Sequence, residues 1–217
     1  MSFEGGQSSV VVQTLRTGNT QRVSRREGIN GAPAWSPDGR RLALTLSGRD
    51  GNPDIWIMTL ADSKLKRLTT GLAIDTEASW SPDGDYVYFT SDRAGGPQVY
   101  RVPANGGEAE RITFEGRYNA RPRLSPDGEK IAVVHDDRGN FRIAVVDVDR
   151  RDVLVLTEGS LDESPAFAPN GETLLYATRV GDRGVLATVS IDGAIRQRLR
   201  ASEGDVREPV WSPFRPN

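Results

Sequence analysis

The sequence predicts an all-β fold of repeated four-stranded antiparallel sheets, which is the architecture of a β-propeller. Two observations lead to this class. No stretch of ten or more residues has the 3.6-residue period of an amphipathic helix. A motif of an apolar residue followed by Ser/Ala-Pro-Asp/Asn-Gly also recurs at intervals of about 44 residues, the length of one propeller blade. The apolar residues of its copies are Trp35, Trp80, Leu124, Phe167 and Trp211, and the last of these precedes Ser212-Pro213-Phe214.

Each copy of the motif predicts a tight turn between two strands. In Pro37-Asp38-Gly39 the proline presets the backbone angle of the first corner, the aspartate tolerates the second, and the glycine accepts the positive φ that closes the turn. The apolar residue before the motif ends one strand, and an apolar run such as residues 41–46 begins the next. The motif therefore indicates a β-hairpin that is repeated along the chain.

Residues 26–69 show the complete unit. After the turn we expect a strand over residues 41–47, a Gly/Asp-rich bend, and a third strand over residues 54–60 that alternates as half-buried strands do. A fourth strand ends at residues 66–69. Together with the strand before the turn, these make one blade of four strands. The same order predicts three further blades, at residues 70–113, 114–157 and 158–200.

The two ends of the sequence complement each other. Residues 1–25 hold only the later strands of a blade, whereas residues 206–214 hold only a first strand. We therefore expect a single domain over residues 1–217 with five blades, in which the C-terminal strand completes the N-terminal blade and leaves no open sheet edge. The same pairing between two chains would give a strand-swapped dimer. We expect the monomer.

Composition argues against several classes of protein. The chain is 36% hydrophobic and 27% charged, and its formal net charge of −2 gives no reason to expect nucleic-acid binding. It has no run of 18 apolar residues that could span a membrane. The absence of cysteine removes disulfides, thiolate catalysis and cysteine-based metal sites. The first residues do not have the pattern of a secretory signal.

Few residues could carry catalysis or bind a metal. His135 is the only histidine, and the sequence has neither a G-x-S-x-G nucleophile motif nor a second histidine for a zinc site. We expect His135 to lie at a hairpin end without a chemical role. Residues 147–152 begin like a calcium loop, but they lack its glycine and distal glutamate and so predict a solvated turn. We expect no catalytic residue, no bound metal and no cofactor.

Several segments resemble the propeller repeats of the TolB family. They are A-W-S-P-D-G at 34–39, S-W-S-P-D-G at 79–84, T-S-D-R-A-G-G-P-Q-V-Y at 90–100, L-D-E-S-P-A-F-A-P-N-G at 161–171 and P-V-W-S-P at 209–213. The resemblance covers essentially the whole chain. It implies a periplasmic protein of the Tol–Pal system whose six-bladed propeller binds the lipoprotein Pal. The family's signal peptide, its N-terminal α/β domain, which contacts TolA, and most of one blade have no counterpart in this sequence. We therefore expect a truncated or engineered propeller, or a divergent natural short form.

The loops that lead into the first strands form the expected partner-binding site. Propeller topology brings these loops to one face, around the mouth of the central channel, and binding residues concentrate on loops held by a rigid scaffold. The expected function is non-catalytic docking of Pal at this face. Two alternatives stay open: an engineered or truncated propeller that no longer binds a partner, and a propeller that gates substrates for a serine peptidase. The residues of the expected site are Asn30, Ala32, Asp75, Thr76, Glu77, Asn119, Arg121, Asp162, Glu163 and Arg207.

Overall fold

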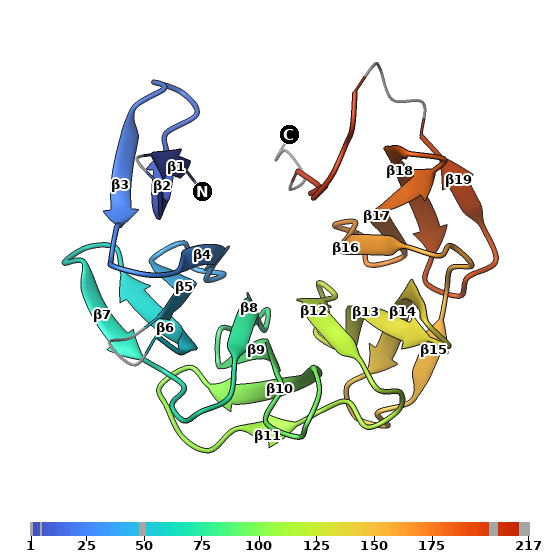
Figure 1. Cartoon of the computed structure of the whole chain (residues 1–217), viewed down its shortest axis with the longest axis horizontal. Coiled ribbons are helices and arrows are strands. Elements are labelled where there is room, and N and C mark those ends of the chain that lie inside the picture. Colours follow the sequence, from blue (N-terminus) through green and yellow to red (C-terminus); the bar gives the residue numbers. More distant parts are fainter. Residues whose placement is uncertain (1, 5, 48–50, 200–203, 213–217) are drawn as a thin grey trace. The chain divides into compact units, whose positions relative to one another are not determined.

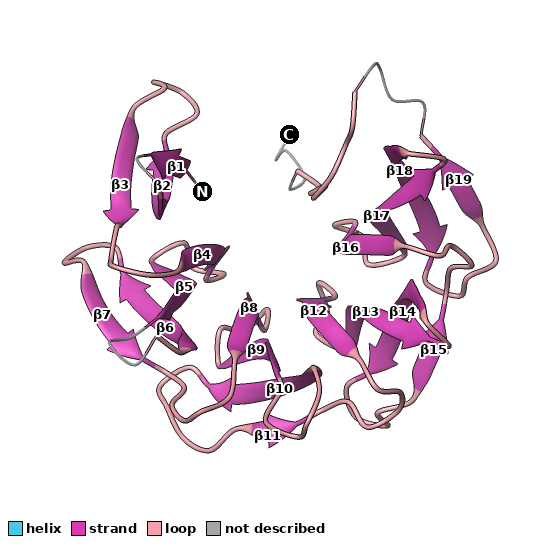
Figure 2. Ribbon diagram, viewed as in Figure 1, coloured by secondary structure: helices cyan, strands magenta, loops and turns pink. Residues whose placement is uncertain are grey.

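The computed structural model describes residues 2–4, 6–47, 51–199 and 204–212. Within these ranges every regular element is a strand, which confirms the all-β prediction (Figure 2). The chain divides into two compact units. Unit 1 comprises Met1–Gly96 and Tyr100–Glu110, and unit 2 comprises Pro97–Val99 and Arg111–Asn217. The single domain expected over residues 1–217 stays a prediction.

Unit 1 contains antiparallel sheets whose strands pair in chain order (Figure 1). The N-terminal sheet has three strands, β1 (Ser2–Glu4), β2 (Gln7–Gln13) and β3 (Thr20–Ser24). The next has four, β4 (Asn30–Trp35), β5 (Arg41–Ser47), β6 (Pro53–Thr59) and β7 (Lys64–Arg67). The third, most of which belongs to this unit, consists of β8 (Asp75–Trp80), β9 (Tyr86–Ser91), β10 (Gln98–Pro103) and β11 (Glu110–Arg111).

Unit 2 contains two sheets with the same strand order (Figure 1). One is formed by β12 (Asn119–Leu124), β13 (Lys130–Asp137), β14 (Asn140–Asp147) and β15 (Val153–Val155). The other is formed by β16 (Asp162–Phe167), β17 (Thr173–Val180), β18 (Arg183–Ser190) and β19 (Arg196–Arg198).

The turn after each first strand closes as its chemistry predicts. Gly39 has a φ of 67°, and its amide donates to Ser36 O over 2.9 Å. Asp38 accepts hydrogen bonds from Ser36 Oγ at 2.5 Å and from Arg40 N at 3.0 Å. These two bonds, the first being the larger cause, lower the pKa of Asp38. The same closing bond, 2.9 Å long, recurs at Gly84, Gly128 and Gly171.

The core of unit 1 lies on both faces of the β4–β7 sheet. Because side chains alternate along a strand, β5 places Leu42, Leu44 and Leu46 in a cluster that includes Val10. Ala43 belongs to another cluster, together with Trp80, Phe89 and Tyr100 of the β8–β11 sheet. A strand covered on both faces has a nearly continuous apolar sequence, which explains residues 42–46.

The core of unit 2 lies between its two sheets. Val134 and Ile143 from the β12–β15 sheet pack in one cluster with Leu174 and Tyr176 of β17. Burying a side chain of this size stabilises the fold by about 1.5–3 kcal/mol. This packing fixes the positions from which the first strands β12 and β16 project.

The expected closure is not confirmed. Residues 204–212, all of them described, belong to no sheet, and the β1–β3 sheet has three strands where the other sheets have four. Residues 213 and 214 of the expected composite blade lie outside the described residues.

In the part of the chain that the structure describes, no helix is long and apolar enough to cross a membrane.

Candidate partner-binding site

The first strand of each four-stranded sheet begins with a buried polar residue. Asn30 and Asn119 are fully buried, and Asp75 and Asp162 are 1% exposed. A buried polar group is costly unless it is hydrogen-bonded, and all four have partners. Their partners lie mainly in the loop before the strand and on the neighbouring second strand, so these residues fix how each first strand starts.

Each unit has one asparagine and one aspartate anchor, and the hydrogen-bond partners differ from anchor to anchor. In unit 1, Asn30 Oδ1 accepts from Ser24 Oγ at 2.7 Å and from Arg26 N at 2.8 Å. Asp75 instead receives both of its bonds from one Nη of Arg93, at 2.8 and 3.1 Å. In unit 2, Asp162 accepts from Gly159 N at 3.2 Å and from Thr178 Oγ1.

The Asn119 side chain makes three hydrogen bonds, one of them to the single histidine. Its Nδ2 donates to Gln98 Oε1 at 3.0 Å and to Glu115 O at 2.7 Å. Its Oδ1 lies 2.9 Å from His135 Nδ1, so His135 is the donor in this pair. His135 lies within β13, 8% exposed, and supports the anchor from there. Burial disfavours the charged imidazole and lowers the pKa of His135. The negative charges of Asp137, Asp136 and Glu115 act in the opposite direction but are the smaller effect.

The residue two positions after each anchor has an unusual backbone. Register shifts mark a β-bulge in all four first strands. At each bulge a non-glycine residue adopts a left-handed φ between 43° and 58°, and Glu208 repeats this with a φ of 50°. Such conformations cost about 1–3 kcal/mol and persist where the surroundings hold them, often at functional sites. The residues are Ala32, Glu77, Arg121, Ser164 and Glu208.

The partly exposed residues of the expected site lie beside these bulges. In unit 1, where β4 and β8 lie side by side (Figure 1), these residues are Ala32, Thr76 and Glu77. Glu77 N donates to Thr45 Oγ1 at 3.3 Å, and Thr90 Oγ1 donates to Glu77 Oε2 at 3.3 Å.

In unit 2, Arg121 and Glu163 are partly exposed and Arg207 is exposed. Arg121 Nη1 donates to Ser164 Oγ at 2.7 Å and so joins the bulges of β12 and β16. Each unit therefore carries part of the expected site, with its backbone fixed by the anchors.

Sequence reasoning did not separate supporting residues from accessible ones. Asn30, Asp75, Asn119 and Asp162 have almost no exposed surface, so they can position a binding loop but offer a partner little to touch. Ser164 and Glu208 were not expected in the site, although they hold the same strained position as Glu77. Aligning the repeats on the polar residue that starts each first strand would have found them.

Residues 147–152 form a turn, as expected. Asp147 Oδ1 accepts from Arg150 N at 2.8 Å and from Asp149 N at 3.1 Å, and both bonds, the first being the larger cause, lower the pKa of Asp147. Among the described residues, no group of three or more His, Cys, Asp and Glu side chains could hold a metal ion.

The chain repeats a four-stranded meander. Each meander has a Pro-Asp-Gly type turn at one end of its first strand and a bulge with a buried polar anchor at the other. This combination defines a β-propeller repeat protein. The TolB β-propeller domain family matches residues 1–215, and the chain belongs to this family.

The chain is similar to several named proteins. It is 52% identical over 117 residues to the Tol-Pal system protein TolB of Xanthomonas campestris, a match that covers 53% of this chain and 27% of that protein. The crystal structure of TolB from Acinetobacter baumannii matches 98% of this chain and 53% of that one, with 46% identity and a TM-score of 0.91. The match to the crystal structure of the tricorn protease covers 91% of this chain and 21% of the protease chain, with 17% identity and a TM-score of 0.71, and it shows a shared fold alone. The chain thus spans about half of the A. baumannii structure and about a quarter of the X. campestris protein.

Proposed function

We propose that this chain is a non-catalytic, protein-binding propeller of the Tol–Pal system that docks the globular domain of the lipoprotein Pal in the periplasm. The observation that carries this proposal is the repeated, bulged first-strand start, held by a buried anchor in all four complete sheets. Membership of the TolB propeller family and likeness to Tol-Pal system proteins support the choice of partner.

The geometry supports binding because it fixes the loops before a partner arrives. A preorganised loop loses less conformational entropy on association, so more of its contact energy appears as affinity. The accessible side chains that we propose as contacts are Ala32, Thr76, Glu77, Arg121, Glu163 and Arg207.

The geometry around the single histidine also favours a scaffold over an enzyme. A general base needs to reach the group that it deprotonates. His135 is buried, and its ring nitrogen is bonded to Asn119. The likeness to a peptidase-associated propeller is below 25% identity and carries only the fold.

Isothermal titration calorimetry with the globular domain of Pal tests the proposal. Glu77→Ala and Arg121→Ala should each weaken binding, by about 2 kcal/mol if the side chain is central to the interface. Arg40→Ala is the matched control, because Arg40 is exposed on the turn after β4, at the other end of that strand from the bulge. Loss of affinity in the control but not at Glu77 or Arg121 would refute the assigned face. If wild-type protein fails to bind, the proposal is wrong and a propeller without a surviving partner is favoured.

We further propose that residues 208–213 act as the first strand that the β1–β3 sheet lacks. Two features of unit 2 support this: the left-handed Glu208, and Trp211 Nε1, which donates to Ala166 O at 3.2 Å. In unit 1, Trp80 makes the equivalent bond to Ala34 O at 3.1 Å. Deleting residues 208–217 should lower the melting temperature sharply and promote aggregation, whereas an equally stable, monomeric truncated chain would contradict closure.

A further inference from the structure

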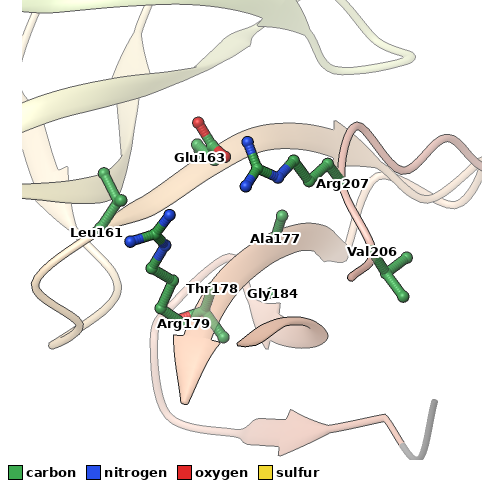
Figure 3. Close-up of a pocket in the computed structure, with 8 residues that line it drawn as sticks. All are labelled: Leu161, Glu163, Ala177, Thr178, Arg179, Gly184, Val206 and Arg207. Atoms are coloured by element: carbon green, nitrogen blue, oxygen red, sulfur yellow. The ribbon is translucent and has the colours of Figure 1, made fainter. Parts of the chain in front are cut away.

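A small pocket, open to solvent, lies in unit 2 where the segment 204–207 passes the β17–β18 hairpin (Figure 3). Leu161, Ala177 and Val206 give it apolar walls. Glu163, Arg179 and Arg207 also line it, and Figure 3 shows their charged ends around one space. Arg179 belongs neither to the anchors nor to the bulges of the candidate site.

The segment that forms one wall is fixed to the hairpin. Asp205 Oδ1 accepts a hydrogen bond from Gly184 N, and Val206 N donates to Gly184 O at 3.2 Å. A Cβ atom at position 184 would lie 2.5 Å from Asp205 Oδ1 and 2.9 Å from Val206 O, so this close approach requires glycine. The pocket is therefore formed before any ligand binds.

The charged side chains differ in how far they are already paired. Arg207 is oriented by Asp205, whose Oδ2 accepts from Nε at 3.1 Å and from Nη2 at 2.9 Å, which leaves Nη1 for another acceptor. Within the part of the chain that the structure describes, the side chains of Arg179 and Glu163 make no hydrogen bond or ion pair, although the charge of Arg179 contributes to the lowered pKa of Asp205. Two guanidinium groups and one carboxylate thus stand ready at the pocket.

We propose that this pocket receives an acidic side chain of a protein partner between Arg179 and Arg207, while Glu163 receives a basic group from a nearby position of the same segment. Guanidinium groups match a carboxylate in geometry as well as charge. The apolar walls suit the aliphatic part of the acidic side chain. A ligand with one kind of charge would face repulsion from Glu163 or from the arginines, so the pocket selects a segment that carries both signs.

This inference rests on the proposed function, because it makes the pocket a subsite for Pal, and charge reversal tests it. Affinity for the globular domain of Pal is measured for wild type, Arg179→Glu and the control Arg198→Glu. Arg198 is exposed on β19 of the same sheet and does not line the pocket. We expect Arg179→Glu to bind about tenfold more weakly than wild type, a difference that should shrink as salt is raised, and Arg198→Glu to change affinity by less than about twofold. Equal affinities of both variants and wild type would overturn the pocket and leave the proposed function standing.

If the wild-type chain does not bind Pal, a peptide probe decides the inference separately. The arginine Nε–Hε resonances are followed by NMR while acetyl-Asp-Gly-Lys-amide is added, with acetyl-Asn-Gly-Gln-amide as the uncharged control. Saturable shifts of Arg179 and Arg207 with the charged peptide alone would support the pocket without Pal. Unchanged resonances, or equal shifts with both peptides, would refute it.

Discussion

Replacing Asn119 by alanine tests how the binding loops are held. The change removes the donor to Gln98 Oε1 and Glu115 O and the acceptor for His135 Nδ1. Gln98 Oε1 keeps a hydrogen bond from Thr113 Oγ1 at 2.7 Å, and the carbonyl of Glu115, an exposed residue, can turn to water. His135 Nδ1 keeps no such alternative. An unpaired buried group costs about 1–3 kcal/mol, so with the lost bonds we expect about 2–4 kcal/mol less stability.

Urea unfolding followed by circular dichroism measures this loss. Asn105→Ala is the control, because Asn105 is exposed and should change stability by less than about 0.5 kcal/mol. A loss of about 2–4 kcal/mol is a large share of a typical folding stability of about 5–15 kcal/mol. If Asn119→Ala were as mild as the control, the account of Asn119 as a buried anchor would be refuted.

Two further predictions concern the anchor and the tryptophans. Burial lowers the folded-state pKa of His135 below its usual value of 6.5, so on acidification the unfolded chain binds the extra proton first and stability should fall as the pH drops below 6.5. The difference between the urea midpoints at pH 7.5 and pH 5.5 should therefore be smaller for His135→Gln than for wild type. An unchanged difference would argue against this assignment. Trp80→Phe should lower the free energy of unfolding by about 1–3 kcal/mol, because it removes the hydrogen bond from the indole to Ala34 O. Trp56→Phe should lower it by at most about 1 kcal/mol, because the buried Trp56 Nε1 has no hydrogen-bond partner to lose. The reverse order in urea unfolding would contradict this assignment.

The sequence predicts the hairpins well because their chemistry is local. The turn at Pro37-Asp38-Gly39 depends on residues that are adjacent in the chain, and the structure closes it with the expected bond to Gly39 N. Strand positions follow from alternation, as in β6, where Ile55 and Ile57 point to one cluster and Met58 to another. Both signals act over a few residues.

The site is harder to predict because its supports are distant in sequence. Asp75 is hydrogen-bonded to Arg93, 18 residues further on, and Asn119 to His135, 16 residues further on. These two polar residues, which were expected to face a partner, therefore lie inside the protein. The left-handed bulge at Glu77 cannot be read from residue type, because glutamate rarely adopts that conformation. It becomes visible only when the repeats are compared.

Hydrogen–deuterium exchange in the presence of the globular domain of Pal tests the central claim most directly. The account predicts that Pal slows exchange in the first-strand starts and the loops before them. The turns at the other end of the first strands, such as residues 36–41 and 125–130, should exchange as in the free chain. Protection confined to those turns, or no protection in a mixture that should be saturated, would contradict the proposal that this chain binds Pal through its bulged first strands. The segments predicted to be protected are residues 29–34, 74–79, 118–123 and 161–166.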